Sequence, residues 1–176
     1  AASRHCYLLE SAENDQKWGR YSFLGYAPTM ELTCMNGQMT IRRGAEEEEQ
    51  TAETFTTDHP GDTIRKILSE YKSPKIKGLP PFTGGLVGYF SYDYLKYAEP
   101  TLRFPEEGNS DFRDVDLMLF DKVIAFDHYR QKLCLITGVS TAELEDSYKK
   151  AEKELDEMEA LLKSGAKAVI RPLKMK

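Results

Sequence analysis

The chain has 176 residues, of which 40% are hydrophobic and 30% are charged, a composition typical of a globular protein with one well-built core. Its 24 Lys and Arg against 29 Asp and Glu give a net charge of -5, which excludes the basic surface of proteins that bind nucleic acids or anionic membranes. No apolar run is long enough to span a bilayer. The three scattered cysteines, Cys6, Cys34 and Cys134, indicate free thiols in a reducing cytoplasm.

The first 45 residues predict strands. Residues 5–10 and 20–26 have strand character, with a polar turn at 14–17 between them. After Pro28, residues 31–35 and 38–42 predict a hairpin across Asn36-Gly37, because both positions of that turn tolerate a positive φ.

The next segment predicts a loop and a short helix. The acidic run Glu46–Glu49 and the polar residues after it are typical of a solvated loop. Asp62 is placed to cap the helix and Pro74 to end it. Helical spacing is seen at four apolar residues: Ile64, Ile67, Leu68 and Tyr71.

A glycine-rich segment, residues 82–94, raises the question of a phosphate-binding loop. Its core, Gly84-Gly85-Leu86-Val87-Gly88, lacks the GxGxxG spacing, and no Lys-Ser or Lys-Thr follows it. Glycines that alternate with large apolar residues favour a strand against which another backbone packs closely. We therefore interpret the segment as structural.

The last third predicts a second hairpin and a long helix. Residues 100–114 are irregular and polar, with Asp111 and Asp114 as turn-capping residues, and residues 117–127 and 132–137 form a hairpin around 128–131. Ser140 and Glu143 match a capping box at the start of the helix, and Gly165 suits its end. The fold class expected is α+β, with mostly antiparallel sheets, one short helix and one long C-terminal helix packed on them.

Two strings carry the chemistry of a binding site. Leu8-Leu9-Glu10-Ser11 ends an apolar strand with a carboxylate and a hydroxyl, and the stretch from Trp18 to Tyr26 carries a cation and aromatic rings. An amino-acid ligand needs an acid for its ammonium, polar donors for its carboxylate and apolar walls for its side chain. The structural alternative is that Glu10 and Ser11 cap a local turn. No spacing of Ser, His, Cys or Asp predicts a catalytic or metal-binding residue.

These strings, with residues 79–89 and Leu119-Phe120-Asp121, resemble the N-terminal region of anthranilate synthase component I, from about Tyr7 through the terminal helix. In that family the LLES segment belongs to a tryptophan feedback site, and the sheets form part of a sandwich. The resemblance implies that Leu9 packs on the indole, Glu10 engages the ligand ammonium and Ser11 orders the strand. It further implies weaker effector contacts from the neighbouring strand: Arg20, Tyr21 and Ser22.

The resemblance also implies a larger enzyme. The family converts chorismate to anthranilate and pyruvate with Mg²⁺, takes ammonia from a glutamine amidotransferase subunit (component II), and is inhibited by tryptophan. Its chorismate- and Mg²⁺-binding residues lie in a C-terminal half. The expected organisation is therefore a regulatory and scaffold domain over residues 1–165 and a linker over 166–176 toward an absent chorismate-binding domain. Such a fragment would be cytoplasmic and inactive by itself, with no cofactor of its own.

Two alternatives stay open. Aminodeoxychorismate synthase component I belongs to the same superfamily, and residues around the chorismate ring, outside this chain, would distinguish it. The second alternative is a free-standing amino-acid-binding module without catalysis. Whether the reading frame stops after Lys176 or continues into a chorismate-binding domain would decide between this module and an enzyme domain.

Overall fold

The computed structural model describes residues 5–11, 19–44, 51–99, 101–102 and 112–165. The chain divides into two units, residues 1–138 and residues 139–176, and each is described by itself. The turn predicted at 14–17, the acidic run at 46–49, Asp111 and the linker at 166–176 lie outside the described residues.

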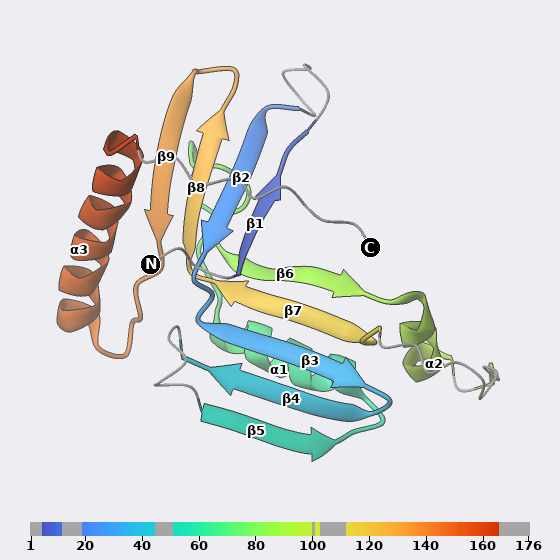
Figure 1. Ribbon diagram of the computed structural model, residues 1–176. Helices are drawn as coiled ribbons and strands as arrows, with labels where there is room; N and C mark the ends of the chain where they lie inside the picture. The colour runs from blue at the N-terminus through green and yellow to red at the C-terminus, as the bar shows by residue number, and fades with distance from the viewer. Residues whose placement is uncertain (1–4, 12–18, 45–50, 100, 103–111, 166–176) are drawn as a thin grey trace. The chain divides into compact units, whose positions relative to one another are not determined.

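The first unit contains two antiparallel sheets, which confirms the α+β class (Figure 1). The four-stranded sheet has the order β1-β2-β8-β9, formed by Cys6–Leu9 (β1), Tyr21–Tyr26 (β2), Lys122–Asp127 (β8) and Lys132–Thr137 (β9). The five-stranded sheet has the order β5-β4-β3-β7-β6, formed by Thr51–Thr56 (β5), Gln38–Arg43 (β4), Met30–Met35 (β3), Val115–Phe120 (β7) and Gly85–Phe90 (β6).

The β3–β4 hairpin forms where the sequence predicts it. Asn36 and Gly37 both have a positive φ, of 48° and 79°, as the favoured two-residue turn requires. The register pairs Met35 with Gln38 across the turn and continues to Met30 and Arg43. The turn residues therefore set the register of this hairpin.

The prediction of one strand over residues 117–127 is wrong. The chain forms β7 and β8, which are separated by Asp121 and belong to different sheets (Figure 1). Phe120 is buried before the break and Val123 after it, and the charged pair Asp121-Lys122 interrupts the apolar run as the chain leaves one sheet for the other. Two charged residues do not by themselves distinguish a crossing between sheets from polar positions within one strand. The hairpin of β8 and β9 around residues 128–131 is confirmed.

Strand β5 is a second correction, because its polar residues predict a loop. It lies at the edge of the five-stranded sheet, and most of its side chains are exposed. Its backbone pairs with β4 over the whole length of both strands. Phe55 is the residue of β5 that packs against the core. The sequence of β5 therefore lacks the alternation of apolar and polar residues by which a half-buried strand is recognised.

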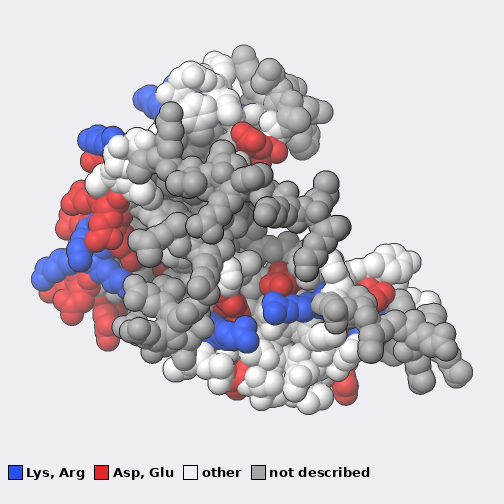
Figure 2. All heavy atoms as spheres, viewed as in Figure 1, with Lys and Arg blue, Asp and Glu red and all other residues white. Residues whose placement is uncertain are grey.

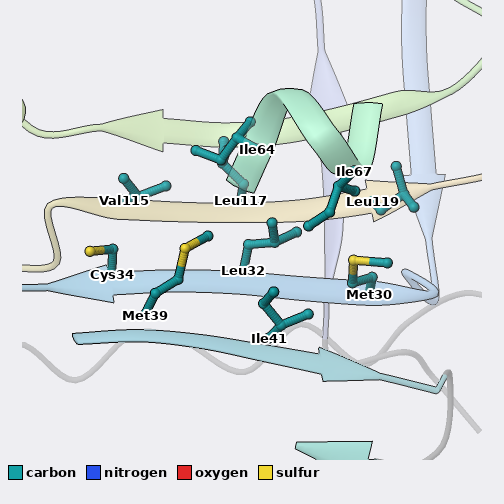
Figure 3. Packing of buried hydrophobic residues seen from close by; sticks show 10 residues of the cluster. All are labelled: Met30, Leu32, Cys34, Met39, Ile41, Ile64, Ile67, Val115, Leu117 and Leu119. Atoms are coloured by element: carbon teal, nitrogen blue, oxygen red, sulfur yellow. The ribbon is translucent and has the colours of Figure 1, made fainter. Parts of the chain in front are cut away.

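Helix α1 (Pro60–Glu70) supplies the apolar side chains that cover one face of the five-stranded sheet (Figure 3). Ile64 and Ile67 are buried as predicted, whereas Leu68 and Tyr71 are exposed. The core that they complete comes from β3, β4 and β7: Met30, Leu32, Cys34, Met39, Ile41, Val115, Leu117 and Leu119.

The predicted ends of α1 are wrong. The N-cap residue is His59, and Pro60, whose fixed φ suits the first turn, opens the helix. Asp62 lies inside that turn and pairs with Arg65 instead of capping. The helix ends at Glu70, before Pro74 could stop it.

Gly84, just before β6, and Gly88, within it, have the structural role that the sequence predicts. A Cβ on Gly88 would overlap the backbone carbonyl oxygen of Asp116 in β7, and one on Gly84 would come within 2.9 Å of the Phe120 carbonyl oxygen. Both positions have a positive φ. The two backbones approach each other too closely for any larger residue.

A short helical segment, Tyr92–Tyr94 (η2) and Leu95–Ala98 (α2), follows β6 and was not predicted. Asp114, which is 4% exposed, accepts hydrogen bonds from the Asn36 backbone N–H and the Tyr97 hydroxyl, both at 2.7 Å. It also forms an ion pair with Lys96 Nζ at 2.8 Å. Asp114 therefore caps a turn, as predicted, but the turn is that of the β3–β4 hairpin.

The second unit contains helix α3 (Leu144–Lys163). Its N-cap residue is Glu143 without a side-chain hydrogen bond, so the predicted capping box does not form. Gly165 adopts a positive φ of 62° just beyond the helix, as predicted. Acidic and basic side chains lie together on the helix surface (Figure 2), including the pair of Lys153 with Glu157. Its packing on a sheet stays a prediction, and none of the described helices is long and apolar enough to cross a membrane.

Candidate functional site

The candidate site lies at the end of β1, the edge strand of the four-stranded sheet. The β1–β2 register ends with Leu9 opposite Phe23. Leu9 is 49% exposed, and Glu10 and Ser11, which follow the strand, are exposed as well. Because the two strands are antiparallel, these residues lie at the same end of the pair as the start of β2.

An apolar surface adjoins this end. The rings of Tyr21 and Phe23 stack with centroids 5.9 Å apart and planes inclined by 28°. Leu9 lies opposite Phe23, so its side chain shares the face of these rings. The structure therefore brings Leu9 and Tyr21, two of the six predicted effector residues, onto one face of the sheet.

Ser22 occupies the opposite face, because side chains alternate along a strand. It is buried, and its Oγ lies 2.7 Å from Nε2 of His128 in the β8–β9 turn. The His128 ring also packs edge-on against Phe126 at 4.8 Å. Ser22 thus connects β2 to the turn.

Arg20 connects the same two elements. Its Nε and Nη2 donate hydrogen bonds to the two carboxylate oxygens of Asp127, at 3.0 and 2.7 Å. The guanidinium also lies over the rings of Tyr21 and Tyr129, at 4.9 and 5.6 Å from their centroids. A planar cation held by a carboxylate and by aromatic rings is well suited to fix the start of β2.

Asp127 is the centre of this connection. It is 4% exposed, and Oδ1 also accepts hydrogen bonds from the backbone N–H groups of Tyr129 and Arg130 at 3.1 Å. The bonds from Arg20 are the main cause that holds the pKa of Asp127 far below its usual value, and the backbone donors add to it. The carboxylate is therefore ionised at neutral pH.

The six predicted residues fall into two groups. Leu9, Glu10, Ser11 and Tyr21 lie at the exposed end of the β1–β2 pair, whereas Arg20 and Ser22 contact the β8–β9 turn. The sequence does not indicate Asp127 and His128 as partners of Arg20 and Ser22, because the partners lie 107 and 106 positions apart. An acidic residue that ends an apolar strand was the one available signal for Asp127.

A cluster of four aromatic rings anchors β1 and was also missed. Tyr7 packs edge-on against Phe120, with ring centroids 4.7 Å apart, and against Phe82 at 6.3 Å. Phe23 completes the cluster at 5.7 Å from Phe82. The Tyr7 hydroxyl is buried and has no hydrogen-bond partner among the described residues, and burial raises its pKa to about 12.

Metal binding finds no support in this part of the molecule. Among the residues that the structure describes, no three His, Cys, Asp or Glu side chains gather into a group that could hold a metal ion. We therefore assign no metal ligand to these residues.

Comparison with known proteins gives the family. The model of the family described as "chorismate binding enzyme" matches residues 4–174. The chain belongs to the chorismate binding enzyme family. Matches to curated members of this family cover most of the chain but only a part of each relative.

Three relatives illustrate the match. Anthranilate synthase component 1 of Acinetobacter calcoaceticus is 38% identical over 160 residues, which cover 89% of this chain and 31% of the relative. The same component of Saccharomyces cerevisiae is 34% identical, covering 84% and 27%. Anthranilate synthase alpha subunit 2 of Arabidopsis thaliana, a chloroplastic protein, is 38% identical, covering 76% and 22%. The chain thus spans about a third or less of the length of these relatives.

The chain also shares its fold with a solved structure. Anthranilate synthase component I from Streptococcus pneumoniae superposes with a TM-score of 0.64 at 24% sequence identity. The match covers 94% of this chain and 33% of that protein.

Proposed function

We propose that the chain is the N-terminal regulatory and scaffold domain of an anthranilate synthase component I, and that it contributes a tryptophan feedback site. The assignment to anthranilate synthase is supported by the names of the relatives. The assignment to one domain of a longer protein is supported by the share of each relative that the chain matches, about a third or less. In this proposal the longer enzyme converts chorismate with Mg²⁺ to anthranilate and pyruvate and receives ammonia from component II. The residues that bind chorismate and Mg²⁺ lie outside this chain, which is inactive alone.

The arrangement at the end of β1 is the observation that carries the effector site. Leu9 shares a face with the stacked rings of Tyr21 and Phe23, and the Glu10 carboxylate and Ser11 hydroxyl follow directly. This gives an apolar surface for an indole beside an anion for an ammonium group. In the proposal Leu9 contacts the indole, Glu10 binds the ammonium and Ser11 orders the strand.

The remaining three residues take supporting parts in the proposal. Tyr21 extends the apolar surface, because its ring stacks on Phe23. Arg20 and Ser22 act indirectly: they hold the start of β2 to Asp127 and His128. A direct contact from Arg20 to the ligand carboxylate would compete with its two bonds to Asp127.

Calorimetric titration of tryptophan tests the proposal. It is performed on the full-length product of the reading frame and on the 176-residue chain, each as wild type, Glu10→Gln and Ser11→Ala. We expect at least a tenfold weaker affinity for Glu10→Gln, because hydrogen bonds to charged groups contribute about 1.5–3 kcal/mol. Glu70→Gln, an exposed change at the end of α1, is the control that should leave the affinity unchanged. Equal affinities for the wild type and both site variants would refute the site.

A further inference from the structure

Strand β1 is weakly held, although the proposed effector residues continue from it. It has four residues and lies at the edge of its sheet, paired with β2. Leu8 and Leu9 are 59% and 49% exposed, so their side chains bury little surface. A ladder this short cannot by itself fix the position of the residues that follow it.

Tyr7 is the side chain of β1 that packs into the interior. Its ring contacts Phe120 and Phe82 edge-on. It also lies over Gly25, its partner on β2, where an added Cβ would overlap the ring. Gly25 thus provides the space in which the Tyr7 ring sits.

The partners of Tyr7 belong to the other sheet and to the segment leading into it. Phe120 ends β7, where the chain crosses from the five-stranded to the four-stranded sheet, and it pairs with Gly85 of β6. Phe82 precedes β6 and contacts both Tyr7 and Phe23. The ring of Tyr7 therefore ties the edge strand to the junction of the two sheets.

Contacts at the start of β1 lie in a more exposed place. The carbonyl oxygen of His5, just before the strand, accepts a hydrogen bond from the Ala27 backbone N–H at 3.2 Å, and the His5 ring contacts the Glu31 carboxylate of β3, an ion pair when the ring is protonated. The His5 side chain is 47% exposed, and ion pairs accessible to water contribute little to stability. It also lies at the end of β1 remote from Leu9.

We propose that Tyr7 is the positioning residue of the effector site: its ring, seated over Gly25 between Phe82 and Phe120, fixes the segment Leu9–Ser11 for tryptophan. This inference rests on the proposed function. Removing the ring would let the end of β1 move, so that tryptophan would have to order the segment on binding. The affinity would fall although Leu9, Glu10 and Ser11 are intact.

The experiment measures tryptophan affinity by calorimetry and thermal stability by melting, in the full-length product of the reading frame. Tyr7→Leu removes the ring, Tyr7→Phe keeps it without the hydroxyl, and Gly25→Ala pushes the ring out of its place. Phe55→Leu is the matched control, because it removes a partly buried ring from β5, at the opposite edge of the five-stranded sheet from β6.

We expect Tyr7→Leu and Gly25→Ala each to weaken tryptophan binding at least tenfold, and Tyr7→Phe to bind within twofold of the wild type. Phe55→Leu should melt earlier and still bind within twofold. Gly25→Ala added to Tyr7→Leu should cause little further loss, since both changes act on the same ring. Gly25→Ala retains Tyr7 and so keeps the test decisive if Tyr7→Leu does not fold.

The outcomes separate this inference from the proposed function. If Ser11→Ala abolishes binding while Tyr7→Leu and Gly25→Ala bind like the wild type, the inference is wrong and the function stands. Equal losses of tryptophan affinity in Phe55→Leu and Tyr7→Leu would also overturn the inference, because lower stability alone would then explain both losses. If the wild type itself does not bind tryptophan, the proposed function fails and the inference with it.

Discussion

Arg20 and Asp127, which are 107 positions apart in the sequence, form a two-pronged ion pair that ties the start of β2 to the end of β8. Two parallel N–H to oxygen bonds are the strongest arrangement available to these side chains. The pair lies where β2 begins, one residue before Tyr21 of the proposed effector surface. The stability of that end of the sheet therefore depends on the charge of Asp127.

The depressed pKa of Asp127 predicts acid sensitivity. A carboxyl with a lower pKa in the folded state stabilises the fold above its unfolded pKa, near 3.8, and this stabilisation is lost as the pH falls toward the folded value. We expect Asp127→Asn to be less stable than the wild type at pH 7. The difference in the free energy of unfolding between the two proteins should narrow steadily below about pH 4, because Asp127 of the wild type then becomes protonated, first in the unfolded chain. Urea unfolding at a series of pH values measures both.

Asp62→Asn is the control for this prediction. Asp62 pairs with Arg65 on the surface of α1, where both side chains are more than 70% exposed. Its variant should follow the wild type at every pH. A constant difference between wild type and Asp127→Asn from pH 7 to pH 2 would contradict the assigned cause.

Local chemistry explains what could be predicted from the sequence. The Asn36-Gly37 turn and the apolar spacing of Ile64 and Ile67 each act over a few residues, and the structure confirms both. The alternation of glycines with large apolar residues around β6 is also local in the sequence, and the structure confirms the close backbone approach that it predicts. The crossing at Asp121 was not predicted, for a physical reason. Buried side chains flank it on both sides, and the charged pair Asp121-Lys122 between them is equally compatible with polar positions within one strand.

The candidate site was predictable only in part. The resemblance to a family identified Leu9, Glu10 and Ser11, which are contiguous. The groups that contact the neighbouring residues come from elsewhere: Asp127 at the end of β8 pairs with Arg20, His128 of the β8–β9 turn lies within hydrogen-bond distance of Ser22, and the ring of Phe120 at the end of β7 packs on Tyr7. Such pairs depend on the tertiary fold, and one sequence without its relatives does not specify them.

The hydrogen bonds of Asp114 predict a large cost for its removal. Asp114→Asn keeps the size of the side chain but weakens the bonds to Lys96, Tyr97 and the Asn36 backbone. We expect a loss of about 2–3 kcal/mol in the free energy of unfolding, because buried partners are left incompletely satisfied. Asp62→Asn should cost less than about 0.5 kcal/mol. Urea denaturation compares the two, and similar losses would show that the Asp114 contacts contribute no more than a surface pair.

Gly88→Ala tests the close approach of β6 to β7. Its Cβ would overlap the Asp116 carbonyl oxygen, and relief requires a shift of one backbone. We expect a loss of at least about 3 kcal/mol, typical of severe strain in a packed structure. Gly78→Ala is the matched control: its φ is +96°, but an added Cβ meets nothing within 4 Å, so only the backbone conformation opposes it. That cost should be about 1–2 kcal/mol. Equal losses in urea unfolding would mean that conformation, rather than contact with β7, explains the glycine at position 88.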